Sequence, residues 1–399
     1  MFTVQLLNPV SKAGLAQLPA KAYHIEEKPA HPDAILVRSF QMHDLAIPES
    51  LVVVGRAGVG VNNIPVKKLT ELGIPVLNTP GANTNAVREL VIAGMLLASR
   101  HLCAAAEYVH GLQAENDAAL ETLIENNKKR FAGTELRGKT LGVVGLGNIG
   151  VQVANAAAGL GMQIQGYDPA ITVERAWQLS SDVKQAKTLD DLFEASDYVT
   201  LHVPLVPETK GMISHEKIAK FKKGACLLNF SRHEIVSDAA VLEALNASQL
   251  RTFVTDFPSL SLKNHPAVVS LPHLGASTLE AEENCALMIV QAMRDFLERG
   301  VIAHSVNFPS IDLRSTNGAE RLAMVHQNVP GMVARISTEF AKKNINIISL
   351  QNGSRDSIAY TLTDIEGIPA PDLLKALSAI EGMIRVRRVE KMHQGQNGL

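Results

Sequence analysis

Short apolar runs alternate with helix-like stretches through the first part of the chain. Residues 34–39, 51–58 and 74–80 are apolar, contain β-branched side chains and end at Gly, Ser or Pro, which predicts buried parallel strands. Residues 82–110 carry apolar side chains on several faces, which predicts one long, largely buried helix with Asn83 or Thr84 as its N-cap.

The same alternation of short apolar runs and helix-like stretches continues over residues 137–275, with clearer boundaries between the elements. Helices are predicted between its apolar runs, and a strongly amphipathic helix is predicted at 278–299. Strands alternating with helices indicate a doubly wound, parallel α/β sheet. The predicted strands of this part are 140–145, 162–168, 198–204, 225–231 and 252–258.

A different pattern occupies the C-terminal part. Residues 300–320 are rich in Pro, Ser and Asn and lack a sustained period, so an irregular connection is predicted there. From residue 321 the order of elements is βαββαβ, which predicts a ferredoxin-like domain. Its predicted strands are 321–327, 345–354, 357–367 and 383–391, and its predicted helices are 329–344 and 370–382.

Composition and charge narrow the function classes. The 399 residues are 46% apolar, enough to build cores, which excludes global disorder. The chain has 38 Lys plus Arg against 40 Asp plus Glu, a balance that argues against nucleic-acid or anionic-membrane partners. The N-terminus has no signal-peptide pattern, so a cytoplasmic protein is expected. The three cysteines have no zinc-like spacing and are predicted to be buried thiols, and no metal site is expected.

The strongest local motif is the glycine-rich stretch Gly145 to Gly150. It follows a predicted strand and opens a predicted helix, the context that indicates dinucleotide binding. Gly145 permits a tight turn, Gly147 lets the backbone approach a pyrophosphate, and Gly150 allows close packing of helix on strand. With Asn148 and Ile149, these residues would present free N–H groups to phosphates.

Asp168 ends the next predicted strand. A carboxylate there accepts hydrogen bonds from ribose hydroxyls and repels a 2′-phosphate, which favours NAD over NADP. The alternative is a loop aspartate before Pro169. Further polar residues follow the later strands, where ligands bind in open α/β sheets. These segments are 202–204, 229–232, 255–257 and 272–278.

Together the motifs resemble the D-isomer-specific 2-hydroxyacid dehydrogenases, in particular members with a C-terminal ACT domain. The resemblance covers nearly the whole chain. It rests on RAGVGVNN (56–63), NTPGANTNAVRELV (78–91), GKTLGVVGLGNIG (138–150), HVPLVPET (202–209), NFSRHEIV (229–236) and PHLGAST (272–278). It implies two Rossmann-like domains, for substrate and NAD, plus the ferredoxin-like ACT domain.

The resemblance assigns roles to individual residues. Arg232 would bind the substrate carboxylate and polarise the 2-oxygen, and His273 would be the general acid/base. Arg38, Ser39, Gly58, Val59 and Asn83 would contact substrate, although Arg38 is alternatively a solvated strand-end residue and Asn83 a helix cap. The implied NAD site comprises Gly145, Gly147, Asn148, Ile149, Gly150, Asp168, Val203, Phe230, Ser231, Arg232, Asp256, His273, Leu274, Gly275 and Ala276.

Two positions depart from the family pattern. The glutamate that normally pairs with the catalytic histidine is missing after Asp256, so Asp256, Glu234 or Glu280 would replace it, or His273 would lack a carboxylate partner. His233 stands where a glycine usually follows the catalytic arginine.

The ACT resemblance implies that two such domains pair and bind an amino acid through His326, Asn328 and Asn346. The alternative is a dimerisation domain without a ligand. A homotetramer with L-serine as effector follows from the resemblance alone.

The expected domains are a substrate domain (1–98 and 286–308), an NAD domain (99–285), a linker (309–318) and an ACT domain (319–399). The expected activity is NAD-dependent oxidation of D-3-phosphoglycerate to 3-phosphohydroxypyruvate, the first step toward L-serine, with feedback by L-serine. Two alternatives remain open: a reductase for another 2-oxo acid such as hydroxypyruvate or glyoxylate, and a non-catalytic corepressor that senses NAD or an amino acid.

Overall fold

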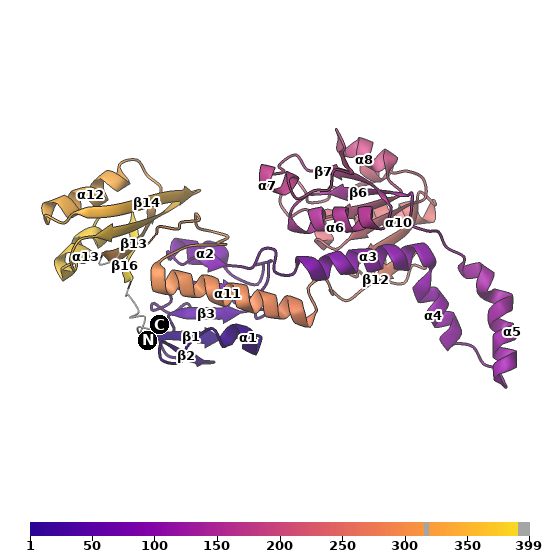
Figure 1. Ribbon diagram of the computed structural model, residues 1–399, viewed down its shortest axis with the longest axis horizontal. Helices are drawn as coiled ribbons and strands as arrows, with labels where there is room; N and C mark the ends of the chain where they lie inside the picture. Colours follow the sequence, from indigo (N-terminus) through magenta and orange to yellow (C-terminus); the bar gives the residue numbers. More distant parts are fainter. Residues whose placement is uncertain (315–318, 390–399) are drawn as a thin grey trace, which may run out of the picture. The chain divides into compact units, whose positions relative to one another are not determined.

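The computed structural model describes residues 1–314 and 319–389. Contacts divide the chain into two compact units, Met1–Ala82 with Glu282–Leu399, and Asn83–Ala281. Figure 1 shows two sheets in the first unit and one in the second. Residues 315–318 of the predicted linker, and residues 390 and 391 of the last predicted strand, lie outside the described residues.

The first unit begins with a five-stranded parallel sheet of order β2-β1-β3-β4-β5. Three of its strands lie where the sequence predicts them, although they are shorter. The other two were not predicted; β2 exposes three of its four residues, so it lacks a buried-strand pattern. The strands are β1 (Phe2–Leu6), β2 (Tyr23–Glu26), β3 (Ala34–Val37), β4 (Val53–Arg56) and β5 (Val76–Leu77).

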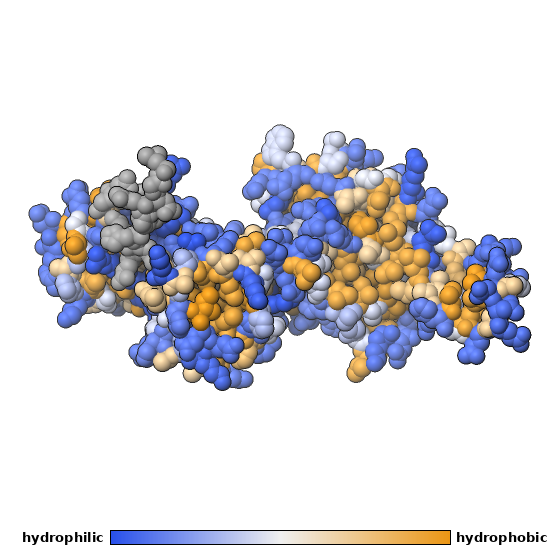
Figure 2. Space-filling model, turned by 60° about the horizontal axis from the view of Figure 1, so that its bottom comes forward, coloured by the Kyte–Doolittle hydropathy of each residue, from blue (hydrophilic) through white to orange (hydrophobic). Residues whose placement is uncertain are grey.

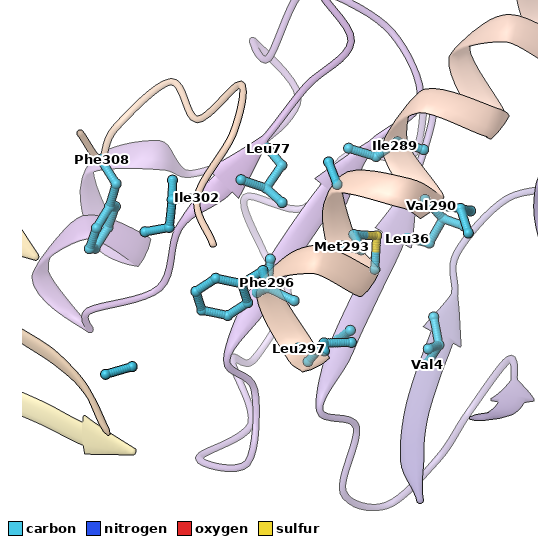
Figure 3. Packing of buried hydrophobic residues seen from close by; sticks show 14 of the residues in the cluster. Val4, Leu36, Leu77, Ile289, Val290, Met293, Phe296, Leu297, Ile302 and Phe308 are labelled. Carbon is cyan, nitrogen blue, oxygen red and sulfur yellow. The ribbon is translucent and has the colours of Figure 1, made fainter. Parts of the chain in front are cut away.

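Helix α11 (Leu279–Arg299) supplies much of the core of this unit. Figure 3 shows Ile289, Met293 and Phe296 of the helix among the side chains of a core that also contains Leu36 and Leu77 of the sheet. Burial of such side chains stabilises the unit by about 1.5–3 kcal/mol each. Of two short helices, α1 (Lys12–Leu15) packs on the same face as α11, and α2 (Val66–Glu71) packs on the other face through Leu69.

The second unit is built on a seven-stranded parallel sheet of order β12-β11-β10-β9-β6-β7-β8. Successive residues of a strand point to opposite faces. Leu227 accordingly belongs to one core cluster and Leu228 to another. The strands are β6 (Thr140–Val144), β7 (Gln163–Tyr167), β8 (Val183–Gln185), β9 (Tyr198–Leu201), β10 (Ala225–Asn229), β11 (Leu250–Thr255) and β12 (Val268–Ser270).

Helices cover both faces of this sheet, as its continuous apolar strands require. They confirm the doubly wound α/β fold that the sequence predicts. The helices are α3 (Thr84–Arg100), α6 (Asn148–Gly159), α7 (Val173–Ala176), α8 (Leu189–Ala195), α9 (His215–Ile218), η2 (His233–Ile235) and α10 (Asp238–Asn246).

The predicted single helix over 82–110 is wrong. His101 adopts a left-handed conformation with φ 51°, which separates α3 from α4 (Leu102–His110), and the two helices are bent by 66°. With α5 (Asp117–Asn127) and η1 (Lys128–Phe131), α4 forms an arm in which no residue is buried. Figure 2 shows apolar patches, in orange, among hydrophilic side chains at the right-hand end of the view, where the arm lies. Cys103 lies exposed on the arm, contrary to the predicted burial of all three cysteines.

No single helix among the described residues has the length and apolar content needed to cross a membrane. The bent pair α3 and α4 meets that test only when both helices are counted together.

Helix α3 also decides where the units divide. It contacts β10, β11 and α6, so residues 83–98 belong to the second unit, whereas the sequence assigned them to the substrate domain. Residues 282–285 conversely belong to the first unit, because α11 packs there from Glu282 onward.

The C-terminal sheet confirms the predicted βαββαβ order. Its strands are antiparallel to their neighbours in the order β14-β15-β13-β16. The elements are β13 (Glu320–Gln327), α12 (Met332–Lys342), β14 (Ile347–Arg355), β15 (Ile358–Ile365), α13 (Pro371–Ser378) and β16 (Met383–Val389).

Both faces of this sheet are buried. Leu322 and Met324 pack under α12 and α13. Ala323, Val325 and Tyr360 face the other way and join the core that contains Phe296 of α11. Residues 301–311, predicted as part of an irregular connection, contribute to the same core through Ile302, Phe308 and Ile311.

Hydrogen bonds reinforce this contact. The guanidinium of Arg387 donates to the carbonyl oxygens of Phe296 and Leu297 at 2.8 and 3.1 Å. The Tyr360 hydroxyl donates to the carbonyl of Gly300 at 2.7 Å. Carbonyls at a helix C-terminus have no partner within the helix, so these donors cap α11.

Candidate active site

The glycine-rich turn joins β6 to α6 in the second unit. Gly145 has φ 88°, and a Cβ atom there would lie 2.5 Å from the carbonyl oxygen of His202. A Cβ on Gly150 would lie 1.9 Å from the carbonyl oxygen of Gly145, so both positions require glycine. Gly147 faces open space. The turn therefore leaves room for a ligand beside the first N–H groups of α6.

Helix α6 begins with Asn148 and Ile149, as the motif predicts. Asp168, just after β7, accepts hydrogen bonds from the backbone N–H groups of Leu146 at 2.8 Å and Ala170 at 2.9 Å. Its carboxylate thus ties the end of β7 to the glycine turn. Each carboxylate oxygen has a second lone pair, so hydrogen bonds from a ribose remain possible.

We expect Asp168→Ala to raise the KM for NAD and to narrow the preference for NAD over NADP. The variant loses the ribose acceptor and the charge that repels a 2′-phosphate. Steady-state kinetics with both cofactors measure this preference. Asp182→Ala, a loop aspartate on the same domain, is the control. An unchanged NAD/NADP ratio in Asp168→Ala would contradict the assigned role.

The other predicted residues of this unit lie at the carboxyl ends of neighbouring strands. Because β9, β10, β11 and β12 are adjacent and parallel, their carboxyl ends share one edge of the sheet. Val203 follows β9, Arg232 follows β10, Asp256 follows β11, and His273 follows β12. The topology therefore brings these four positions to one edge.

The loop that carries Arg232 is held by Asn229, the first residue of the segment 229–232 that the sequence analysis singled out at this strand end. Asn229 is 1% exposed; its side chain accepts from the backbone N–H of Ser231 and donates to the carbonyl of Arg232. The Ser231 hydroxyl donates to the carbonyl of Leu201 at 2.5 Å. Arg232 itself is half-buried and donates from Nη1 to the carbonyl of Ser231. A buried polar side chain at a strand end was the available signal.

Phe230 lies differently from its neighbours in this loop. It is 6% exposed and belongs to the core between the sheet and α3, where a Cβ on Gly94 would lie 2.9 Å from its ring. Its aromatic ring therefore packs in the protein interior, and only its backbone is placed at the strand end.

His273 is exposed and lies in a left-handed conformation with φ 49°. Its N–H donates to the carbonyl oxygens of Asp256 at 2.9 Å and Leu271 at 3.1 Å. The imidazole packs against the ring of Phe257, with centroids 4.9 Å apart. The loop continues through exposed Leu274 and Ala276, with buried Gly275 between them. The backbone thus fixes His273 at the rim of the sheet.

Asp256 is a buried carboxyl group beneath this loop. Its Oδ2 accepts from the N–H of Gly275 at 3.0 Å. Burial raises the pKa of Asp256, while that hydrogen bond and the charges of His273 and Arg232 act in the opposite direction. Its Oδ1 has no partner within the part of the chain that the structure describes. This buried oxygen lies at the carboxyl edge of the sheet, the edge that also carries the glycine turn. It can accept a hydrogen bond from a ligand with an amide N–H, such as a nicotinamide dinucleotide.

The departures from the family pattern appear in the structure as follows. No ion pair joins His273 to a carboxylate among the residues described. Glu234 and Glu280 are exposed, and Asp256 contacts the His273 backbone instead. His233 is exposed, with Nε2 3.9 Å from Oδ2 of Asp238.

The predicted substrate residues of the first unit lie at the ends of β3 and β4. Asn8 Oδ1 accepts from the N–H groups of Arg38, Ser39 and Phe40 at 3.2, 3.1 and 2.8 Å. The guanidinium of Arg38 pairs with Glu282. The Arg38 side chain is still 39% exposed, so both alternatives that the sequence left open for it remain.

Gly58 follows β4 with φ 147°, and a Cβ there would lie 1.9 Å from Nη1 of Arg56. Val59 is 37% exposed. Asn83 is the N-cap residue of α3 in the second unit, as the sequence predicts, but its side chain makes no capping hydrogen bond. Its Oδ1 is buried and has no partner among the described residues.

The three predicted effector residues lie in the C-terminal sheet. His326, at the end of β13, is 2% exposed; its ring contacts the carbonyl of Gln327 and the hydroxyl of Thr361, each at 2.9 Å. Burial lowers the pKa of His326. Asn328 donates to the carbonyl of Asp356 at 3.1 Å. Asn346 is exposed.

The strand register separates these residues within one domain. His326 pairs with Ala359, whereas Ile347, next to Asn346, pairs with Ile365 at the far end of β15. Asn346 therefore lies at the opposite end of the sheet from His326 and Asn328.

The glycine turn, the acidic residue after the second strand, and the Arg and His at neighbouring strand ends define an NAD-dependent dehydrogenase. Comparison with known proteins agrees. Residues 92–275 match the family described as D-isomer specific 2-hydroxyacid dehydrogenase, NAD binding domain, and residues 321–382 match the ACT domain.

The chain is similar to D-3-phosphoglycerate dehydrogenase of Haemophilus influenzae, with 34% identity over 84% of this chain and 81% of that protein. It is also similar to the Escherichia coli K12 enzyme of the same name, with 34% identity over 85% and 82% of the two chains. The NAD+-bound 3-phosphoglycerate dehydrogenase of Entamoeba histolytica has a TM-score of 0.60 and 27% identity, covering 77% of this chain and 98% of that one. This chain belongs to the D-isomer specific 2-hydroxyacid dehydrogenases and carries an ACT domain.

Proposed function

We propose that this protein oxidises D-3-phosphoglycerate to 3-phosphohydroxypyruvate, the first step toward L-serine, and that L-serine inhibits it through paired ACT domains of a homotetramer. The observation that carries the substrate is the match to relatives named D-3-phosphoglycerate dehydrogenase over more than four fifths of the chain, and the separate match of residues 321–382 to the ACT domain supports the regulation.

The chemistry follows from the residues at the sheet edge. Arg232 would bind the substrate carboxylate and the 2-oxygen, since a guanidinium carries permanent charge and several donors. His273 would accept the proton of the 2-hydroxyl group as the C2 hydrogen leaves as hydride and the carbonyl forms. Bound NAD supplies the acceptor for that hydride. Gly145, Gly147, Gly150 and Asp168 would hold its pyrophosphate and ribose.

Turnover assays test the substrate. We expect NAD-dependent oxidation of D-3-phosphoglycerate with a kcat/KM well above that for D-glycerate, because D-glycerate lacks the phosphate that Arg38 and Ser39 would bind. Faster reduction of glyoxylate or hydroxypyruvate than of 3-phosphohydroxypyruvate would favour the reductase alternative. Absence of turnover with every 2-hydroxy acid and 2-oxo acid would favour the corepressor.

The proposal of paired ACT domains is supported by the separation of Asn346 from His326 and Asn328. A single domain holds these residues at opposite ends of its sheet. A second copy, related by a twofold axis, can place its Asn346 beside His326 and Asn328 of the first. Serine would then inhibit by binding one conformational state better than another.

We expect Asn346→Ala to abolish serine inhibition while leaving kcat unchanged, because it removes an exposed amide outside the catalytic unit. Gln351→Ala, on β14, is the control. Calorimetry and inhibition assays with L-serine measure the effect on the full chain. Deletion of the ACT domain is a poorer test, because the second face of its sheet shares a core with α11. No serine binding to the wild type at millimolar concentration would refute the regulatory proposal.

A further inference from the structure

The loop at the end of β3 has an unusually well anchored backbone. Asn8 accepts from its three N–H groups. Asn63 donates to the carbonyls of Arg38 and Phe40 at 3.4 and 2.8 Å, and Nε of Arg56 donates to the carbonyl of Arg38 at 3.1 Å. The side chains of Asn8, Asn63 and Arg56 therefore all hydrogen-bond to the main chain of Arg38 and fix the position from which its guanidinium extends.

That guanidinium is paired with a carboxylate of the same chain. Nη2 of Arg38 donates to Oε1 of Glu282, in the first turns of α11. The two side chains are 39% and 37% exposed, so solutes can reach the pair. An arginine has five N–H donors, and this contact uses Nη2. A second anion can therefore approach the same guanidinium, but it meets the negative charge of Glu282 there.

We infer that Glu282 is a specificity-determining residue that weakens the binding of the substrate phosphate at Arg38. This inference rests on the proposed function, in which Arg38 contacts that phosphate. A phosphate dianion is repelled by the Glu282 carboxylate more strongly than a neutral hydroxyl group is. Glu282 therefore sets the KM for phosphorylated substrates and has little influence on unphosphorylated ones.

The isosteric variant Glu282→Gln removes the charge and keeps the shape. We expect its KM for D-3-phosphoglycerate to fall about three- to tenfold. An effect of this size is expected when one repulsive charge is removed from a contact between partly exposed groups. Its kcat should stay the same, and its KM for D-glycerate should change little. Competitive inhibition by inorganic phosphate should strengthen by a similar factor, because phosphate alone probes the charge at Arg38.

Glu283→Gln is the matched control, because Glu283 is the next residue of the same helix and is exposed. It should leave both KM values unchanged. An unchanged or higher KM for D-3-phosphoglycerate in Glu282→Gln, or an equal shift for D-glycerate, would overturn the inference. Failure of the proposed function is a separate result, since the wild-type protein would then not oxidise D-3-phosphoglycerate at all.

Discussion

His273→Asn should lower kcat by about 10²–10⁴-fold, the usual contribution of a general acid/base. Asparagine is the suitable replacement because His273 has φ 49°, and Asn tolerates this left-handed conformation better than Ala does. The backbone hydrogen bonds to Asp256 and Leu271 would then persist. The fall in kcat would then be due to the missing imidazole and not to a displaced loop.

His304→Asn is a matched control. His304 is an exposed histidine with φ 55°, in the first unit, so the same exchange is made in the same backbone conformation. The His304→Asn variant should have the same kcat as the wild type. Binding of NAD to His273→Asn, followed by fluorescence, checks that the cofactor site is intact. Turnover of His273→Asn within about threefold of the wild type would remove His273 from the chemistry.

Asp364→Ala should destabilise the first unit by about 3–5 kcal/mol, because it leaves the guanidinium of Arg321 buried without its counter-charge. The two side chains are 5% and 2% exposed. Nε and Nη2 of Arg321 donate to the two carboxylate oxygens at 2.6 and 2.9 Å, and Nη1 donates to the carbonyl of Arg299. The pair therefore links the ACT sheet to the end of α11.

Thermal and urea unfolding of the full chain measure this effect. The double variant Arg321→Met with Asp364→Leu should recover most of the lost stability, since removal of both charges leaves no buried ion. Asp372→Ala, which breaks the exposed pair with Lys343, should leave the unfolding transition almost unchanged. A melting temperature of Asp364→Ala equal to that of Asp372→Ala would show that the buried pair contributes nothing.

Regular local patterns were read correctly from the sequence. Strands such as β9 and β10 are mostly apolar and are buried along their whole length, which distinguishes them from the amphipathic helices between them. The glycine turn was recognisable because Gly145 and Gly150 each stand where a Cβ atom would collide with backbone. The βαββαβ order followed from a change of period at each element.

Features that depend on distant contacts were not readable in this way. The apolar pattern runs unbroken from α3 into α4, but only α3 has a sheet to pack against, and the helix breaks at His101. Asn8 looks like an ordinary loop residue in the sequence, because the backbone N–H groups of residues 38–40 that donate to its side chain become its neighbours only after folding.

The sequence by itself determined the fold class, the glycine turn and the placement of Arg232 and His273 at strand ends, because these depend on short-range patterns of size, polarity and backbone freedom. Only the tertiary structure decided three other features. It paired Arg38 with Glu282, it placed Asn346 at the far end of the sheet from His326, and it buried the second face of the ACT sheet against α11. Such contacts join residues far apart in the chain, so register and packing select them and no local pattern records them.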